Sequence, residues 1–177
     1  MENTKRQQLK TFILDVDGVL TDGKYYYTTE GKVMKVFGPD DHDALLLLKN
    51  YLDIIMITGD KKGLPISEKR VVQDMKFPLY AVSTFERIKW IKENYNLDSV
   101  IYMGDGIFDG VIFDKVAYGI APSNAFYKTK EKAHYITQHA GGDSAVAEAC
   151  VHILEKFFVP VDFNNLMLKE GQGEWGE

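Results

Sequence analysis

Cysteine is nearly absent from the 177-residue sequence, in which Cys150 is the only one. A single cysteine excludes an intramolecular disulfide framework and a metal site built from several thiolates, so we expect a reducing, cytoplasmic setting. The longest apolar stretch near the N-terminus is far shorter than a helix that spans a bilayer, and residues 2–8 lack the apolar core of a signal peptide. We therefore expect no membrane partner and no secretion signal.

Positive charge is scarce as well. The chain has 21 Lys and Arg residues against 26 Asp and Glu residues, a formal net charge of −5, and no stripe of basic side chains. Because binding to a phosphate backbone depends on clustered cations, we expect no nucleic-acid partner. The length, with 45% hydrophobic residues, suits one buried core and is short for two domains. The composition indicates an acidic enzyme of one domain.

Short apolar segments alternate with helical patterns along the chain, as in a parallel sheet covered by helices on both faces. We therefore predict a Rossmann-like α/β three-layer sandwich over residues 1–158, followed by a Gly- and charge-rich tail over 159–177. Asp143 or Ser144 is expected to cap the last helix. The predicted strands are 11–14, 54–57, 79–82, 100–103 and 117–120, and the predicted helices are 41–51, 65–76, 84–95, 107–115, 123–131 and 143–158.

Residues 24–37 interrupt this alternation. Aromatic and β-branched residues stand on both sides of a turn at Glu30-Gly31, which predicts a β-hairpin. Because an isolated two-stranded hairpin is only marginally stable, we expect it to pack against other subunits of a homo-oligomer.

Polar residues follow three of the predicted strands, at the end of a parallel sheet where ligands bind. Two carboxylates two residues apart at the end of a strand face the same side. Such a pair can bind Mg²⁺ through oxygen atoms while one carboxylate attacks phosphorus and the other transfers protons. The pattern therefore indicates Mg²⁺-dependent phosphoryl transfer. The residues are Asp15 and Asp17, Thr58 and Gly59, and Asp105 and Asp109.

In order and spacing, the segments 15–23, 57–59 and 104–109 resemble the motifs of the haloacid dehalogenase superfamily. The chain is similar in particular to the small branch without a cap domain that contains 3-deoxy-D-manno-octulosonate 8-phosphate and nonulosonate 9-phosphate phosphatases. Segments 121–125 and 133–137 and the Gly141-Gly142 pair carry this narrower similarity.

The resemblance implies a phosphatase that acts on a small phosphorylated metabolite, most simply a sugar phosphate, and that assembles as a homotetramer. Asp15 would be the nucleophile that forms an aspartyl-phosphate, and Asp17 would be the general acid and base. Asp15, the backbone carbonyl of Asp17, and Asp105 would bind Mg²⁺, with Asp109 in support. Thr58 and the backbone of Gly59 would bind the transferring phosphoryl group.

Several positions depart from the family pattern. The superfamily lysine that holds the nucleophile and the phosphate together falls at Thr84. Arg87, one turn further along the predicted helix, and the pair Lys61-Lys62 are candidate replacements; the alternative is that they are solvated surface cations.

Within the segment 37–44, Asp41 matches the residue that the branch has at this position, and His42 follows it. Both residues are candidate substrate contacts. Asp143 and Ala147 stand where octulosonate phosphatases typically have arginines, and Asp40 stands where the branch has arginine or a small polar residue. A neutral or basic metabolite is therefore an alternative to an acidic sugar.

A function from a different class also fits the sequence. The chain could be a catalytically weak or retired phosphatase-like module that serves in oligomeric assembly. The missing lysine supports this alternative, whereas the retained Asp15, Asp17 and Asp105 argue against it.

Overall fold

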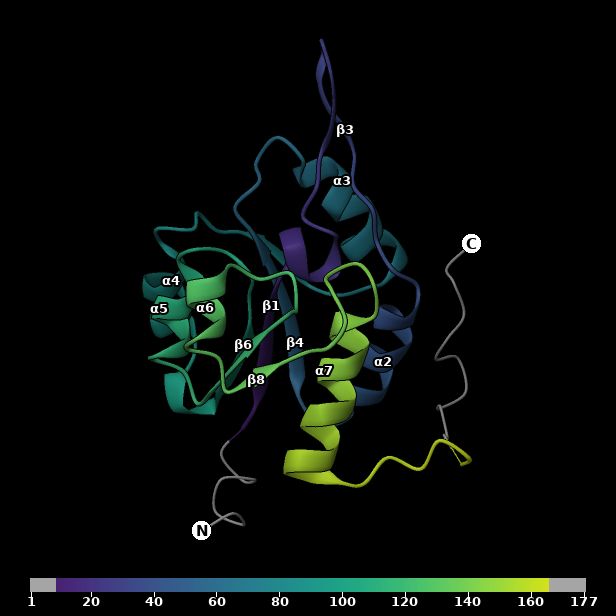
Figure 1. The fold of residues 1–177 in the computed structure, drawn as a ribbon, viewed down its shortest axis with the longest axis vertical. Helices are drawn as coiled ribbons and strands as arrows, with labels where there is room; N and C mark the ends of the chain where they lie inside the picture. The colour runs from purple at the N-terminus through teal and green to yellow at the C-terminus, as the bar shows by residue number, and fades with distance from the viewer. Residues whose placement is uncertain (1–8, 166–177) are drawn as a thin grey trace.

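The computed structural model describes residues 9–165 (Figure 1). Its centre is a sheet of six parallel strands in the order β5-β4-β1-β6-β7-β8. The chain runs outward from β1 to β5 and then returns to β6, so the strand order reverses beside β1, where open α/β sheets bind ligands. The strands are β1 (Thr11–Asp15), β4 (Asp53–Thr58), β5 (Leu79–Ala81), β6 (Val100–Met103), β7 (Tyr118–Ala121) and β8 (Tyr135–Ile136).

Helices cover both faces of this sheet. Figure 1 shows α4 and α5 on one side and α2 and α7 on the other. The strands are therefore apolar on both faces: Phe12 and Leu14 pack toward α2 and α7, whereas Ile13 packs toward α4 and α5. The helices are α2 (Asp40–Leu48), α3 (Leu64–Glu68), α4 (Arg87–Asn94), α5 (Asp109–Phe113), α6 (Tyr127–Lys130) and α7 (Ala145–Ile153).

Shorter helical turns complete these elements. They are η1 (Val16–Leu20) after β1, η2 (Lys69–Asp74) after α3, η3 (Leu97–Ser99) before β6, and η4 (Leu154–Phe158) after α7. The predicted α/β sandwich is confirmed. The sequence analysis missed β8, because two residues are too few to produce a periodic pattern.

The predicted hairpin is confirmed within residues 24–37. Strand β2 (Tyr26–Thr28) pairs antiparallel with β3 (Gly31–Met34), and the two form a separate sheet that projects above the central one in Figure 1. An antiparallel bridge between Thr21 and Phe37 closes its base. The hairpin therefore begins and ends beside the turn that follows β1.

Helix α7 starts differently from the prediction. Ser144 occupies the N-cap position, but its hydroxyl donates to the Asp40 carboxylate at 2.9 Å. The carboxylate that binds the first turn belongs to Asp41 of α2, which accepts from the Ala147 N–H at 2.9 Å. The cap is thus supplied by a neighbouring helix, which a local sequence pattern does not reveal.

The predicted C-terminal tail is described only as far as Asn165, and residues 166–177 lie outside the described part of the chain. Over residues 9–165, no helix has the length and apolar character that crossing a bilayer requires.

Candidate active site

A cavity of about 390 Å³ lies at the carboxyl ends of β1, β4 and β6. These strands are neighbours, since Asp15 of β1 pairs with Ile57 of β4, and Leu14 of β1 pairs with Met103 of β6. The loops that follow them therefore surround one space. The cavity is lined by Asp15, Asp17, Gly23, Tyr25, Lys32, Gly59, Asp60, Thr84, Arg87, Asp105, Gly106 and Asp109.

The turn after β1 sets the direction of the first carboxylates. Asp15 accepts from the Val16 N–H at 2.8 Å, and the hydroxyl of Thr21 accepts from the Gly18 N–H at 3.1 Å. Gly18 has a φ of 88°, and a Cβ at this position would lie 2.0 Å from an oxygen of Asp105. A glycine is therefore required here both by the backbone conformation and by the approach of Asp105.

Asp17 lies at the cavity wall between a hydroxyl donor and an ammonium group. The hydroxyl of Thr58 donates to its Oδ2 at 2.8 Å, and the Lys35 ammonium lies 2.7 Å from its Oδ1. Thr58 in turn accepts from the Asp60 N–H at 3.1 Å. The predicted acid–base residue and the predicted phosphate-binding threonine are thus in direct contact.

Three carboxylates form a site suited to a hard cation. One oxygen each from Asp15, Asp105 and Asp109 lie within 4.8 Å of one another. Burial, and then the charges of Asp15 and Asp109, raise the pKa of Asp105 to about 8. Burial also raises the pKa of Asp15 to about 7, although the Arg87 guanidinium opposes the rise. An oxygen donor set whose negative charges repel one another fits Mg²⁺.

Asp109 is held by three hydrogen bonds. Its Oδ1 accepts from the Tyr102 hydroxyl at 2.8 Å and from Arg87 at 3.2 Å. Its Oδ2 accepts from the Gly106 N–H at 2.8 Å. The supporting role of Asp109 stays a prediction, since these contacts fix its carboxylate without showing how it would meet an ion.

Arg87 supplies a buried cation at the predicted nucleophile. It begins α4, is 4% exposed, and bonds both carboxylate oxygens of Asp15, with Nη1 2.5 Å from Oδ2 and Nη2 2.9 Å from Oδ1. Thr84, which stands at the position of the family lysine, also lines the cavity. Lys61 and Lys62 are exposed and do not line it. Among the candidate replacements, Arg87 is the one that the fold brings to the nucleophile.

The hairpin contributes residues that the sequence analysis did not identify. Lys32 forms an ion pair with Asp60, and its ammonium lies 3.2 Å from the centroid of the Tyr25 ring. Lys35 bonds to Asp17, Asp60 and Ser67. Residues three apart on a strand face opposite sides, so the spacing of the two lysines did not suggest one site. Strand β3 ends at Met34, so the alternation of sides no longer applies at Lys35. Both lysines therefore contact Asp60.

Asp41 and His42 do not line this cavity. Asp41 is buried against the start of α7, where it binds the Ala147 N–H. His42 is also buried, with its ring edge-on to Phe77 at a centroid distance of 6.3 Å. The structure thus places both predicted substrate contacts in the packing around α2.

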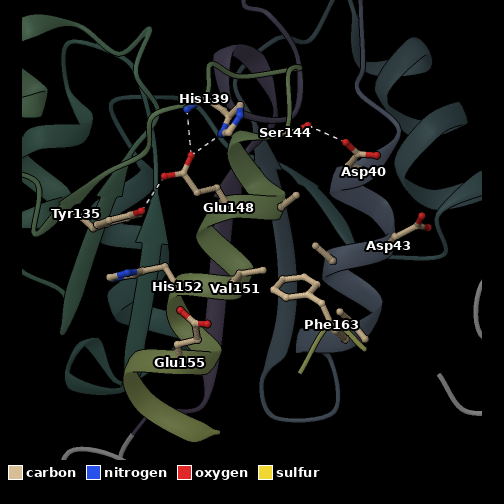
Figure 2. Close-up of a pocket in the computed structure, with 13 residues that line it drawn as sticks. Asp40, Asp43, Tyr135, His139, Ser144, Glu148, Val151, His152, Glu155 and Phe163 are labelled. Atoms are coloured by element: carbon tan, nitrogen blue, oxygen red, sulfur yellow. Dashed lines mark hydrogen bonds and ion pairs between the residues drawn. The ribbon is translucent and has the colours of Figure 1, made fainter. Parts of the chain in front are cut away.

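A second cavity, of about 610 Å³, lies between α2 and α7 (Figure 2). Glu148 of α7 accepts from the Tyr135 hydroxyl at 2.7 Å, and it also accepts from the backbone N–H groups of Gln138 and His139. Although burial acts in the opposite direction, these bonds lower the pKa of Glu148 to about 2. Phe163 also lines this groove. The contacts attach β8 and the loop after it to α7, which is a structural role.

Comparison with known proteins places these features in context. Residues 88–149 match the family model of haloacid dehalogenase-like hydrolases. The 3-deoxy-D-manno-octulosonate 8-phosphate phosphatase of Salmonella typhi is 32% identical over 155 residues, which cover 83% of this chain and 80% of that protein. The corresponding protein of Escherichia coli K12 is 31% identical over 154 residues, which cover 82% of this chain and 79% of that protein.

A solved structure is similar over nearly the same span. The 3-deoxy-D-manno-octulosonate 8-phosphate phosphatase of Moraxella catarrhalis, in complex with magnesium ion, phosphate ion and KDO, has a TM-score of 0.71 and 27% sequence identity. The match covers 87% of this chain and 90% of that one. The similarity therefore extends over most of both chains.

Proposed function

Because this chain belongs to the haloacid dehalogenase-like hydrolases, in the branch without a cap domain that contains the 3-deoxy-D-manno-octulosonate 8-phosphate phosphatases, we propose that it is a Mg²⁺-dependent sugar-phosphate phosphatase. One observation carries the proposal: Asp15, Asp105 and Asp109 form an oxygen-rich site at the end of β1, with Arg87 against the nucleophile. Asp15, the backbone carbonyl of Asp17, and Asp105 would hold the ion, and Asp109 would support it. When bound, Mg²⁺ supplies positive charge that offsets the repulsion between carboxylate and phosphate.

The reaction proceeds in two displacements. A carboxylate oxygen of Asp15 forms a bond to phosphorus while the bond from phosphorus to the sugar oxygen breaks, and Asp17 gives its proton to that oxygen. Asp17 then takes a proton from water, whose oxygen attacks phosphorus and breaks the bond to Asp15. Inorganic phosphate leaves, and both aspartates return to their starting states.

The phosphoryl oxygens need donors of their own. Thr58 ends β4, and Gly59 and Asp60, which follow it, line the cavity beside Asp15 and Asp17. The Thr58 hydroxyl and the Gly59 N–H would bind the transferring group. The Arg87 guanidinium, a rigid fork with several donors, would stabilise charge on the nucleophile and on the phosphoryl group. Arg87 thus takes the role that the family gives to a lysine at the Thr84 position.

The position of Arg87 also weighs against the inactive alternative. A retired module was favoured by the missing lysine, and the pairing of Arg87 with Asp15 removes that support. The intact set of Asp15, Asp17 and Asp105 then favours catalysis.

The hairpin supports a homo-oligomer, which we propose to be a tetramer. Tyr26, Tyr27, Val33 and Met34 are between 48% and 61% exposed, an unusual share of apolar surface on one small element. A second copy that covered these side chains would also enclose the open cavity, as a cap domain does in larger relatives. A cytoplasmic location remains a proposal that rests on the single cysteine.

The function is tested by phosphate release from a panel of sugar phosphates, including octulosonate and nonulosonate phosphates, with and without Mg²⁺. We expect metal-dependent release by the wild type and its loss in Asp15→Asn, which removes the attacking carboxylate but keeps its size. Release that persists in Asp15→Asn would exclude Asp15 as the nucleophile. Folded wild-type protein that releases no phosphate from any member of the panel would favour the assembly module.

A further inference from the structure

A buried lysine joins the hairpin to the predicted acid–base residue. The side chain of Lys35 is fully buried, and its ammonium lies 2.7 Å from Oδ1 of Asp17 and 3.0 Å from Oδ2 of Asp60. It also donates to the hydroxyl of Ser67 at 2.9 Å. Burying an ammonium group costs free energy unless the group is paired, so these three partners fix the position of the Lys35 ammonium.

The surrounding chain leaves Lys35 little freedom. A Cβ at Gly63 would lie 2.7 Å from Cε of Lys35 and 2.1 Å from Oδ2 of Asp60. The segment after β4 therefore packs directly on the lysine stem. Lys35 is enclosed by the hairpin, by the loop after β4 and by Ser67 of α3, and it points at Asp17 from that enclosure.

Each oxygen of Asp17 is held by a different group. Thr58 donates to Oδ2, and Lys35 lies against Oδ1. Asp17 itself lies in the turn after β1, where its φ and ψ of −80° and 114° are extended and not helical. The direction of its carboxyl group therefore depends on these two side chains. Proton transfer requires that direction to match the sugar oxygen within hydrogen-bond reach.

We propose that Lys35 is a positioning residue for proton transfer by Asp17, so that the base of the hairpin is part of the catalytic machinery. The inference rests on the proposed phosphatase function. Without Lys35 the carboxyl group of Asp17 keeps one of its two holding groups and can rotate away from the leaving oxygen. Lys32 is a natural comparison, because it comes from the same hairpin but forms its ion pair with Asp60.

The test compares two leaving groups in wild type, Lys35→Met and Lys32→Met. A sugar alkoxide needs a proton as it leaves, whereas p-nitrophenolate is stable without one. The ratio kcat/KM covers substrate binding and the steps up to departure of the leaving group, so the comparison of the two substrates reports on this proton transfer. The substrates are p-nitrophenyl phosphate and the sugar phosphate from the panel that the wild type hydrolyses fastest.

In Lys35→Met, we expect kcat/KM for the sugar phosphate to fall by about 10- to 100-fold, and that for p-nitrophenyl phosphate to change by less than about threefold. In Lys32→Met, the two substrates should change by the same factor. An equal loss on both substrates in Lys35→Met, or no loss on either, would overturn the inference. If the wild type hydrolyses neither substrate, the proposed function itself fails.

A second variant covers the case in which Lys35→Met does not fold. Ser67→Ala removes the hydroxyl that accepts from the Lys35 ammonium, and it leaves every charge in place. We expect a selective loss on the sugar phosphate of about two- to fivefold, smaller because the ion pair with Asp17 remains. A change that is equal for both substrates, or no change, would contradict the role of Lys35. Thermal melting of each variant establishes that the measured protein is folded.

Discussion

Arg87 binds both carboxylate oxygens of Asp15, across 72 residues of sequence, and shares the same Nη1 with Tyr102 and Asp109. One guanidinium thus connects the first turn of α4 to the ends of β1 and β6. The arrangement fixes the proposed nucleophile and supplies a permanent positive charge beside it, since arginine does not lose its proton in proteins.

Removing this cation should impair catalysis far more than folding. We expect Arg87→Ala to lower kcat for the best sugar phosphate by about 100- to 1,000-fold, the range seen when a group that stabilises developing charge is deleted. Arg87→Lys should retain part of the activity, because it keeps the charge but not the two parallel bonds. The control is Lys62→Ala, which removes an exposed cation in the loop after β4. Its kcat should stay within about twofold of wild type.

The family position of the cation offers a more specific test. The double variant Thr84→Lys/Arg87→Ala moves the positive charge to the residue where the superfamily has its lysine. Because Thr84 lines the same cavity, we expect it to recover at least about tenfold of the activity lost in Arg87→Ala. Failure to recover any activity would show that the guanidinium geometry, and not the charge alone, is required.

Magnesium should stabilise the folded protein through Asp105. With a pKa raised to about 8, this carboxyl group is held against its charged form, which Mg²⁺ would favour. We expect the wild-type Tm to rise with Mg²⁺ concentration, as for any ligand that binds only the native state. Asp105→Asn should have a higher Tm than wild type without metal, and its Tm should respond weakly to Mg²⁺. An equal response of both proteins to Mg²⁺ would place the ion elsewhere.

Asp41 should make stability fall as pH rises. Burial raises its pKa from 3.8 to about 6, so between these values the folded state binds more protons than the unfolded state. By linkage, the free energy of unfolding then decreases with rising pH across that window, and the loss persists above about pH 6. Asp41→Asn keeps an oxygen for the Ala147 N–H and removes the charge. Its stability relative to wild type should therefore increase from pH 4 to pH 7, by about 2 kcal/mol.

Urea unfolding of the two proteins at several pH values measures this difference, with Asp43→Asn, an exposed position of the same helix, as the control. A pH-independent difference between Asp41→Asn and wild type would contradict the assigned cause. The same variant also tests the site, because Asp41 lies outside the catalytic cavity. Its kcat and KM should stay within about threefold of wild type, whereas a substrate contact would raise KM.

The hairpin surface should control assembly. Tyr27 is 61% exposed and Val33 is 51% exposed, so a charge at either position should cost little in a monomer and much in an interface. We expect sedimentation velocity to show a tetramer for wild type and smaller species for Tyr27→Glu/Val33→Glu. Lys92→Glu, an exposed substitution on α4, should not change the assembly. A wild type that is monomeric at micromolar concentration would contradict the proposal.

The sheet and the meeting of Asp15, Asp17 and Asp105 at its edge could be predicted from sequence because both depend on local patterns. Apolar runs define β1, β4 and β6, and the residues that follow each run must meet at one edge of a parallel sheet. Arg87 could only be offered as a candidate, because the face that a helix turns toward a site depends on where the helix begins. The sequence analysis expected this helix to begin at Thr84, whereas α4 begins at Arg87.

Contacts between segments that are distant in the sequence could not be predicted from such local patterns. Lys35 meets Asp17 only because a bridge between Thr21 and Phe37 folds the hairpin base over the turn after β1. Asp41 was interpreted as a substrate contact because its place at a helix start is compatible with one. The packing of α2 on α7 turns it toward Ala147 instead. In both cases the deciding partner is more than ten residues away in sequence.

The hairpin and β1 differ strongly in how far they are protected from solvent. Strand β1 is buried along its whole length and bonded to a strand on each side, whereas β2 is exposed at every residue. Amide hydrogens of β1 should therefore exchange among the slowest in the molecule, and those of β2 among the fastest. Lys35 joins these two regions at Asp17. The proposed proton-transfer step thus depends on a segment that can open locally while β1, which carries the proposed nucleophile, stays closed. Warming should then reduce turnover before it melts the sheet.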